Sequence, residues 1–207
     1  MENDIARIAR VGQKAPDFEV PIFYQGKFGT AKLSDFHGKW LMLYFHPGDF
    51  TFVCGTELSE VASRYPEVHQ LGVEVISFSV DNLYVHKVWN DNEISKIVEG
   101  GVPFRMASDI AGNVGRLYGV YDEKLGLDLR GRYIIDPDGI LQAMEILSSP
   151  VGRSMKEAIR QIQAFQHVRN SKGTEACPAG WQPGLPTLKP STELVGNLWK
   201  VWKPEGN

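Results

Sequence analysis

Six consecutive apolar residues, Trp40–Phe45, lead into a turn at Pro47 and Gly48. An uninterrupted run of this length predicts a strand that is buried on both faces, as the central strands of parallel sheets are. The run is far shorter than the roughly 20 apolar residues that a helix needs to cross a bilayer. We therefore expect a fold built around this strand, with no segment that spans a membrane.

A helix and a second strand follow the turn. Apolar residues recur with a 3.6-residue period from about Cys54 to Gln70, which predicts an amphipathic helix. Val73–Val80 is typical of a strand, Leu83–Val98 of a helix, and Pro103–Ala107 of a short extended segment. Alternating strands and helices indicate a largely parallel central sheet.

The sheet is expected to end in an antiparallel hairpin. Two apolar segments within Gly131–Leu147 flank a turn of Pro137, Asp138 and Gly139, residues that favour tight turns. Ser149 and Pro150 then supply a cap and a first-turn proline for a helix that reaches about Arg169. The sequence thus predicts an α/β domain with a mixed central sheet flanked by helices.

The remaining residues differ in character from this domain. Residues 171–207 hold five of the 12 prolines and three of the five tryptophans, without sustained periodicity. We therefore expect one domain over residues 1–170 and an extended C-terminal arm over residues 171–207. A chain of 207 residues buries enough surface to fold without a disulfide or a structural metal.

Charge and the N-terminus restrict the partners and the compartment. The 22 Lys and Arg residues nearly balance the 25 Asp and Glu residues, giving a formal charge of -3 with mixed signs along the chain. This pattern lacks the basic patch typical of nucleic-acid binding. The N-terminus carries acidic residues and no apolar stretch, unlike a secretory signal. We expect a cytoplasmic protein that binds neither nucleic acid nor membranes.

Two cysteines, Cys54 and Cys177, lie too far apart for the short spacing of a dithiol site or a zinc ribbon. The histidines occur singly, without metal-ligand spacing: His37, His46, His69, His86 and His167. We therefore expect no metal and no cofactor. In an intracellular protein, disulfides that form are usually catalytic or redox-sensing.

Cys54 lies between the buried strand and the first turn of the following helix. Unpaired backbone N–H groups and the helix dipole at such a position favour an anion, and a thiolate is one. Thr51, three residues earlier, is placed to direct its hydroxyl at the same spot. On spacing alone an alternative stays open, in which Thr51 only caps the helix and Cys54 only fills the core.

The segment Pro47–Glu57, with its P-x-x-x-T-x-x-C pattern, resembles the signature of the peroxiredoxins. Three further motifs match in order: Arg130 before a strand, Arg153 before the last long helix, and Cys177 in the arm. The resemblance covers nearly the whole chain and is to the typical two-cysteine class related to alkyl hydroperoxide reductase C. It implies a thioredoxin-like fold and a thiol-dependent peroxidase.

The resemblance also implies roles around Cys54. Cys54 would be the peroxidatic thiolate, which attacks a hydroperoxide and becomes a sulfenic acid. Thr51 would hydrogen-bond the peroxide, Pro47 would shield the thiolate, and Arg130 would stabilise both the thiolate and the charge on the breaking O–O bond. Arg153 and Glu57 would support the site.

Two positions depart from the family pattern. Gly55 stands where the family usually has proline, which makes the first helical turn more flexible. His46 stands where the family usually has tyrosine or phenylalanine and introduces a group that can respond to pH.

Cys177 would be the resolving cysteine. In the family it condenses with the sulfenic acid of the partner subunit, and a dithiol reductant, thioredoxin-like or a flavoprotein disulfide reductase system, then removes the intersubunit disulfide. We expect an accessible thiol on a mobile arm, and a homodimer that assembles into a ring of dimers. The arm carries three apolar anchors that could dock across the dimer interface or cover their own domain: Trp181, Trp199 and Trp202.

Three alternatives stay open at this point. A redox sensor or relay would use the same Cys54 chemistry to oxidise another protein, and a ring-forming holdase would use the same scaffold. A hydrolase with a Cys-His pair is disfavoured, because no Asn or Asp partner can be argued from spacing. The preferred hydroperoxide, the reductant and the ring size cannot be derived from the sequence.

Overall fold

The structure, a computed structural model, describes residues 8–204. The chain divides into two compact units, Met1–Met155 and Lys156–Asn207. The extreme N-terminus, where we expect no secretory signal, lies outside the described residues.

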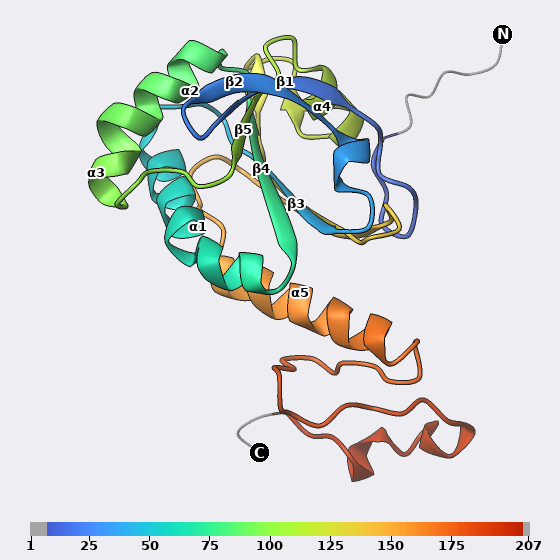
Figure 1. Cartoon of the computed structure of the whole chain (residues 1–207). Helices are drawn as coiled ribbons and strands as arrows, with labels where there is room; N and C mark the ends of the chain where they lie inside the picture. Colours follow the sequence, from blue (N-terminus) through green and yellow to red (C-terminus); the bar gives the residue numbers. More distant parts are fainter. Residues whose placement is uncertain (1–7, 205–207) are drawn as a thin grey trace, which may run out of the picture. The chain divides into compact units, whose positions relative to one another are not determined.

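The first unit is built on a seven-stranded mixed sheet with the order β2-β1-β5-β4-β3-β8-β9 (Figure 1). The pairs β3–β4 and β4–β5 are parallel, and all other neighbours in this sheet are antiparallel. Its strands are β1 (Glu19–Tyr24), β2 (Lys27–Lys32), β3 (Trp40–Phe45), β4 (Val73–Ser79), β5 (Arg105–Ser108), β8 (Arg130–Ile135) and β9 (Leu141–Leu147). A separate two-stranded hairpin pairs β6 (Tyr121–Asp122) with β7 (Leu127–Asp128).

Helices lie on both sides of the central strands. Helices α1 (Phe52–Gln70) and α2 (Leu83–Trp89) lie on one side in Figure 1, where α1 packs against β4 and α2 against β1 and β5. A π-helical turn, η2 (Asn90–Ile94), joins α2 to α3 (Ser95–Ile97), so the expected helix over 83–98 forms with an irregular centre. Helix α4 (Asn113–Tyr118) lies on the other side, and η1 (Leu33–Phe36) is a short 3-10 turn.

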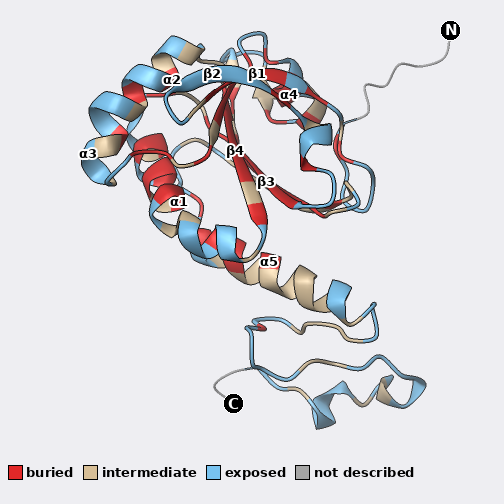
Figure 2. Cartoon of the chain, in the orientation of Figure 1, coloured by how far each residue is buried: buried red, intermediate tan, exposed pale blue. Residues whose placement is uncertain are grey.

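The apolar run Trp40–Phe45 forms the middle of this sheet. All six residues of β3 are buried (Figure 2). All six residues of the neighbouring β8 are buried as well. One core cluster joins Phe45 of β3 to Phe78 of β4, with the rings stacked at 4.6 Å, and to Tyr133 of β8. The prediction of a doubly buried central strand is confirmed.

The second unit contains most of α5 (Met155–Asn170) and the arm that follows it. The arm has two short 3-10 turns, η3 (Thr192–Leu194) and η4 (Leu198–Lys200), and an antiparallel bridge between Ala176 and Leu188. The domain boundary near residue 170, at the far end of α5, stays a prediction. Among the described residues, no helix combines the length and apolar character that crossing a bilayer requires.

One buried acid lies in the part of the fold that periodicity did not predict, around α4 and the β6–β7 hairpin. Asp128 is fully buried, and neither carboxyl oxygen has a hydrogen-bond partner in the described part of the chain. Gly115 leaves the space for it, because a Cβ there would lie 2.2 Å from Asp128 Oδ1. Burial, followed by the nearby charge of Asp109, raises the pKa of Asp128 to about 8.

This raised pKa predicts an unusual dependence of stability on pH. The folded state disfavours ionised Asp128, so the free energy of unfolding should fall as pH rises from about 4, the ordinary pKa, to about 8. Asp128→Asn removes this titration. Relative to the parent, the variant should gain on the order of 3 kcal/mol between pH 5 and pH 8 in urea unfolding. Asp35→Asn, at an exposed aspartate, is the control. A constant difference across this pH range would contradict the prediction.

Candidate functional site

The cysteine of the first unit, Cys54, lies in the first turn of α1. Helix α1 begins directly after the loop that leaves β3, and Gly55 N–H donates to Thr51 O at 2.9 Å to close its first turn. Cys54 is 0% exposed. The helix N-terminus therefore directs its partial positive charge at a sulfur that is shielded from water.

Arg130, the first residue of β8, brings a full positive charge to this sulfur. Its Nη1 donates to Cys54 Sγ at 3.3 Å and to Glu57 Oε2 at 2.7 Å, and its Nε donates to Ser149 O at 2.7 Å. Burial alone would lower the pKa of the guanidinium, but the bonds to Cys54 and Glu57 outweigh it and raise the pKa. The fixed cation stabilises negative charge on the sulfur.

Glu57 holds this arginine and a second one. It lies one helical turn after Cys54 and is 2% exposed. Arg153 donates to Glu57 from Nε at 2.9 Å, from Nη2 at 2.9 Å and from its backbone N–H at 2.7 Å. Burial alone would raise the pKa of the Glu57 carboxyl, but the bonds and charge of Arg153 and the charge of Arg130 lower it. Glu57 is thus a buried carboxylate between two guanidinium groups.

The guanidinium of Arg153, a residue of the segment before α5, packs over the ring of Tyr44 in β3. Arg153 Nη1 donates to Gly131 O at 2.5 Å, and its Cζ lies 3.5 Å from the centroid of the Tyr44 ring. A Cβ at position 131 would lie 2.6 Å from a methyl group of Val120, so the packing of β8 against Val120 requires glycine there. Arg153 therefore contributes to the arrangement of Glu57 and Arg130 rather than to the sulfur directly.

Thr51 and Pro47 lie in the loop before α1. The Thr51 hydroxyl donates to Gly48 O at 2.8 Å, and the structure records no side-chain cap from Thr51 to the helix. Thr51 is exposed and Pro47 is half-buried. The bond to Gly48 holds the Thr51 side chain beside the loop at the start of the helix, with its oxygen lone pairs still able to accept.

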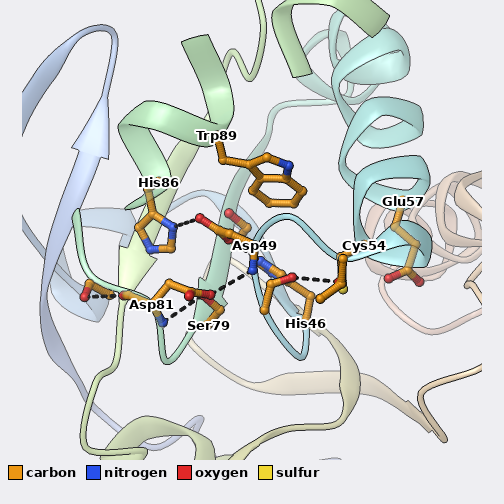
Figure 3. Close-up of polar contacts among 12 residues, drawn as sticks. His46, Asp49, Cys54, Glu57, Ser79, Asp81, His86 and Trp89 are labelled. Carbon is orange, nitrogen blue, oxygen red and sulfur yellow. Dashed lines mark hydrogen bonds and ion pairs between the residues drawn. The ribbon is translucent and has the colours of Figure 1, made fainter. Parts of the chain in front are cut away.

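A second buried cluster, which the sequence did not indicate, anchors this loop. Asp49 accepts from His46 Nε2 at 3.0 Å and from His86 Nδ1 at 2.7 Å, and both imidazoles are 0% exposed (Figure 3). Burial alone would raise the pKa of Asp49, but the bonds from His46 and His86 lower it. His86 Nε2 faces Ala107 O at 3.2 Å. The His86 ring is thus held between a carboxylate oxygen and a backbone carbonyl oxygen.

The Asp49 backbone and the neighbouring aromatic rings complete this anchor. Asp49 N–H donates to Asp81 Oδ2 at 2.8 Å, which fixes the loop to the end of β4. Phe50 has a φ of +57°, a left-handed conformation that costs a non-glycine residue roughly 1–2 kcal/mol. Trp89 packs near both Phe50 and His46, and a Cβ on Gly55 would lie 4.0 Å from the Trp89 ring. A larger side chain would therefore have room for its Cβ at position 55.

Cys177 lies in the second unit. Its thiol donates to Ala164 O of α5 at 3.7 Å, and the residue is half-buried. Burial, opposed by Arg160 and assisted by Glu175, raises the pKa of Cys177. The expectation of a mobile, accessible thiol is thus modified: the reduced cysteine is held against a helix.

The residues predicted around Cys54 therefore separate into three groups. Arg130 and Glu57 come together with the sulfur, and Arg153 acts behind them. Thr51 and Pro47 lie in the loop that precedes it. Sequence reasoning missed Asp49 and His86, whose pairing joins residues 37 positions apart. Among the described residues no group of three or more His, Cys, Asp or Glu side chains is arranged to hold a metal ion.

Two protein-family models together match most of this chain. The AhpC/TSA family matches residues 11–144, and the C-terminal domain of 1-Cys peroxiredoxin matches residues 164–201. A selenocysteine-containing peroxiredoxin, PrxU, of Peptoclostridium acidaminophilum is 62% identical over 192 residues, covering 93% of this chain and 95% of its own length. Alkyl hydroperoxide reductase C of Amphibacillus xylanus is 41% identical, covering 91% and 98%.

A solved structure of similar fold is the reduced 2-Cys peroxiredoxin of Plasmodium vivax. It superposes with a TM-score of 0.85 at 34% identity, covering 91% of this chain and 98% of its own. The mixed sheet with flanking helices is therefore shared with a protein of known structure over nearly its whole length.

Asp49→Asn tests the second buried cluster. The amide carries no charge and presents only one acceptor oxygen, so His86 loses its anion and one imidazole loses its partner. We expect a loss of about 3 kcal/mol or more in the free energy of unfolding, as for other broken buried pairs. Urea unfolding at pH 7 measures it.

Asp91→Asn is the matched control, because Asp91 is exposed and pairs only at the surface with Lys87 and Asn90. It should change the free energy of unfolding by less than about 0.5 kcal/mol. If Asp49→Asn fell within that same range, the cluster would not anchor the loop.

Proposed function

Because this chain belongs to the AhpC/TSA family of peroxiredoxins, we propose that its reaction begins at Cys54 and is resolved by Cys177. The predicted family and its thioredoxin-like fold are confirmed by the relatives and the solved structures. The chain is accordingly a thiol-dependent peroxidase, an oxidoreductase. The assignment of individual residues is our proposal and rests on the site geometry.

One observation carries the assignment of Cys54. The Arg130 guanidinium donates to Cys54 Sγ at the start of a helix, within a fully buried site. A cation that cannot lose its proton near neutral pH, combined with a helix N-terminus, favours the thiolate that the reaction needs. The Cys177 thiol differs, because it lies after α5 rather than at a helix N-terminus and donates to a carbonyl, Ala164 O.

The first step oxidises the sulfur. The Cys54 thiolate attacks the distal oxygen of hydrogen peroxide or an organic hydroperoxide, so that the S–O bond forms and the O–O bond breaks. The departing hydroxide or alkoxide takes up a proton and leaves as water or an alcohol, and Cys54 becomes a sulfenic acid. Arg130 stabilises the charge on both the attacking and the leaving atoms.

The neighbouring residues support this step. We assign to Thr51 a hydrogen bond to the peroxide and to Pro47 the exclusion of water. Glu57 and Arg153 keep the Arg130 fork in place, since Glu57 accepts from both arginines.

The second step forms a disulfide between subunits. Cys177 of one subunit condenses with the Cys54 sulfenic acid of the other, which requires a homodimer, and a thioredoxin-like dithiol protein or a flavoprotein disulfide reductase system then reduces the bond. Assembly of these dimers into a ring and a cytoplasmic location, where such reductants maintain thiols, complete the proposal.

Single-cysteine variants test these roles. Cys54→Ser should abolish consumption of hydrogen peroxide, because a hydroxyl cannot replace the thiolate. Cys177→Ser should still consume one equivalent and then stop. After stoichiometric peroxide, the parent should run as a covalent dimer on a non-reducing gel, and both variants as monomers.

Other outcomes have distinct meanings. Turnover by Cys54→Ser would refute the nucleophile, and an oxidised parent that runs as a monomer would refute the intersubunit bond. Accumulation of a stable mixed disulfide with another protein, without turnover by a dithiol reductant, would favour a redox relay.

Arg130→Lys tests the cation. Lysine retains the charge but loses the planar fork that reaches Cys54 and Glu57 together. We expect the second-order rate with hydrogen peroxide to fall at least tenfold, about 1.4 kcal/mol of transition-state stabilisation. Arg64→Lys, at a surface pair with Glu67 on the same helix as Cys54, should remain within twofold of the parent. A rate within twofold for Arg130→Lys would remove Arg130 from the site.

A further inference from the structure

Arg160 lies on the face of α5 that carries the Cys177 thiol. The thiol donates to Ala164 O, and Arg160 precedes Ala164 by four residues, so the two share one side of the helix. Arg160 and Cys177 also line one cavity of about 620 Å³, together with Ala164, Phe165, Glu175 and Pro190 among others. Arg160 and Cys177 therefore border the same space.

Hydrogen bonds on two sides fix the Arg160 guanidinium. Its Nε and Nη2 donate to the two carboxylate oxygens of Glu157, each at 2.7 Å, and its Nη1 donates to Trp181 O at 2.9 Å. Trp181 is buried and its indole N–H donates to Leu185 O at 3.0 Å. Arg160 thus attaches the segment after Cys177 to α5, the helix whose Ala164 carbonyl accepts the hydrogen bond from the Cys177 thiol.

The charged groups that act on Cys177 have opposite signs. Burial and Glu175 raise the pKa of the thiol, whereas Arg160 opposes them. Glu175 is itself held by His167 Nε2 and by the Thr187 hydroxyl, each at 2.7 Å. The reduced arm therefore keeps a protonated thiol near a fixed cation, and of Arg160 and Glu175 it is Arg160 that favours the thiolate.

We propose that Arg160 is a positioning residue for the second half of the peroxidase reaction, in which it holds the Cys177–Trp181 segment on α5 and stabilises negative charge on Cys177 Sγ. The proposal rests on Cys177 being the resolving cysteine. In that step the Cys177 proton passes to solvent, and the thiolate attacks the sulfenic sulfur of Cys54. The S–S bond forms, the S–O bond breaks, and the departing hydroxide takes up a proton to give water.

The reactivity of a single thiol tests the electrostatic part. In the Cys54→Ser background only Cys177 can be alkylated, and its rate with iodoacetamide is measured from pH 6 to pH 10. We expect Arg160→Gln to slow alkylation at pH 7.5 at least threefold and to move the titration of the rate to higher pH. Arg160→Lys retains the charge and should recover more than half of the rate.

Glu175→Gln is the matched control of opposite sign, because it removes an anion that acts on the same thiol. It should accelerate alkylation at pH 7.5. If Arg160 only anchored the arm, Arg160→Gln would loosen the segment, expose the thiol and speed alkylation, with no recovery by lysine. That result, or an unchanged pH profile, would overturn the proposal.

Single-turnover kinetics with both cysteines present connect this measurement to the reaction. After one equivalent of peroxide, disulfide formation in Arg160→Gln should be at least threefold slower than in the parent, with the initial oxidation of Cys54 unchanged. An unchanged rate of disulfide formation would overturn the role in resolution. If Cys177 did not resolve Cys54 at all, the parent would form no disulfide, and the alkylation data would still report on Arg160.

Discussion

The carboxylate of Glu57 holds together the parts that make the buried sulfur reactive. It lies one turn after Cys54 and accepts from Arg130 on β8 and from Arg153 in the segment before α5. Without it, two buried guanidinium groups would lack their counter-ion, a situation that costs several kcal/mol. One side chain therefore fixes the helix, the strand and the following segment in a single arrangement, and the position of the sulfur follows from it.

A second ionic cluster lies on the other side of the cysteine, as Figure 3 shows. Asp49 with its two imidazoles fixes the loop before α1 to the ends of β4 and α2. The Asp49 bonds hold Phe50 next in sequence, whose left-handed backbone would otherwise relax. Both clusters are buried around the carboxyl end of β3. The strand itself contributes apolar packing, and the polar side chains of both clusters come from residues that follow it in the chain.

How far the sequence predicts this arrangement depends on the range of each interaction. The β3 strand follows from its uninterrupted apolar run, and the helix from Phe52 to Gln70 follows from its 3.6-residue period, so both are predictable to within two residues. Helix α4 and the β6–β7 hairpin are too short to show a period. The contact between Arg130 and Cys54 joins residues 76 positions apart, and only the family resemblance indicated it.

The cluster around Asp49 is a second case in which a contact between residues distant in sequence cannot be predicted from local spacing. His46 departs from the family pattern at the sequence level, and the structure places it fully buried against Asp49. No spacing rule pairs Asp49 with His86, because their proximity arises only when α2 packs beside the loop. Likewise, the sequence gives no reason to expect Cys177 to be held by Ala164, since that contact depends on how the arm folds back along α5.

The complete burial of Cys54 has a consequence for the order of events. Because Cys54 is 0% exposed, neither a hydroperoxide nor the thiol of another polypeptide can reach its sulfur without movement of the residues around it, and the polypeptide needs the larger opening. In the proposed reaction, the first turn of α1 must therefore open before the disulfide forms, and each 1.4 kcal/mol that this opening costs lowers the open population tenfold. Opening of this turn therefore controls the disulfide step in particular, because the second thiol arrives on a polypeptide and not on a small molecule.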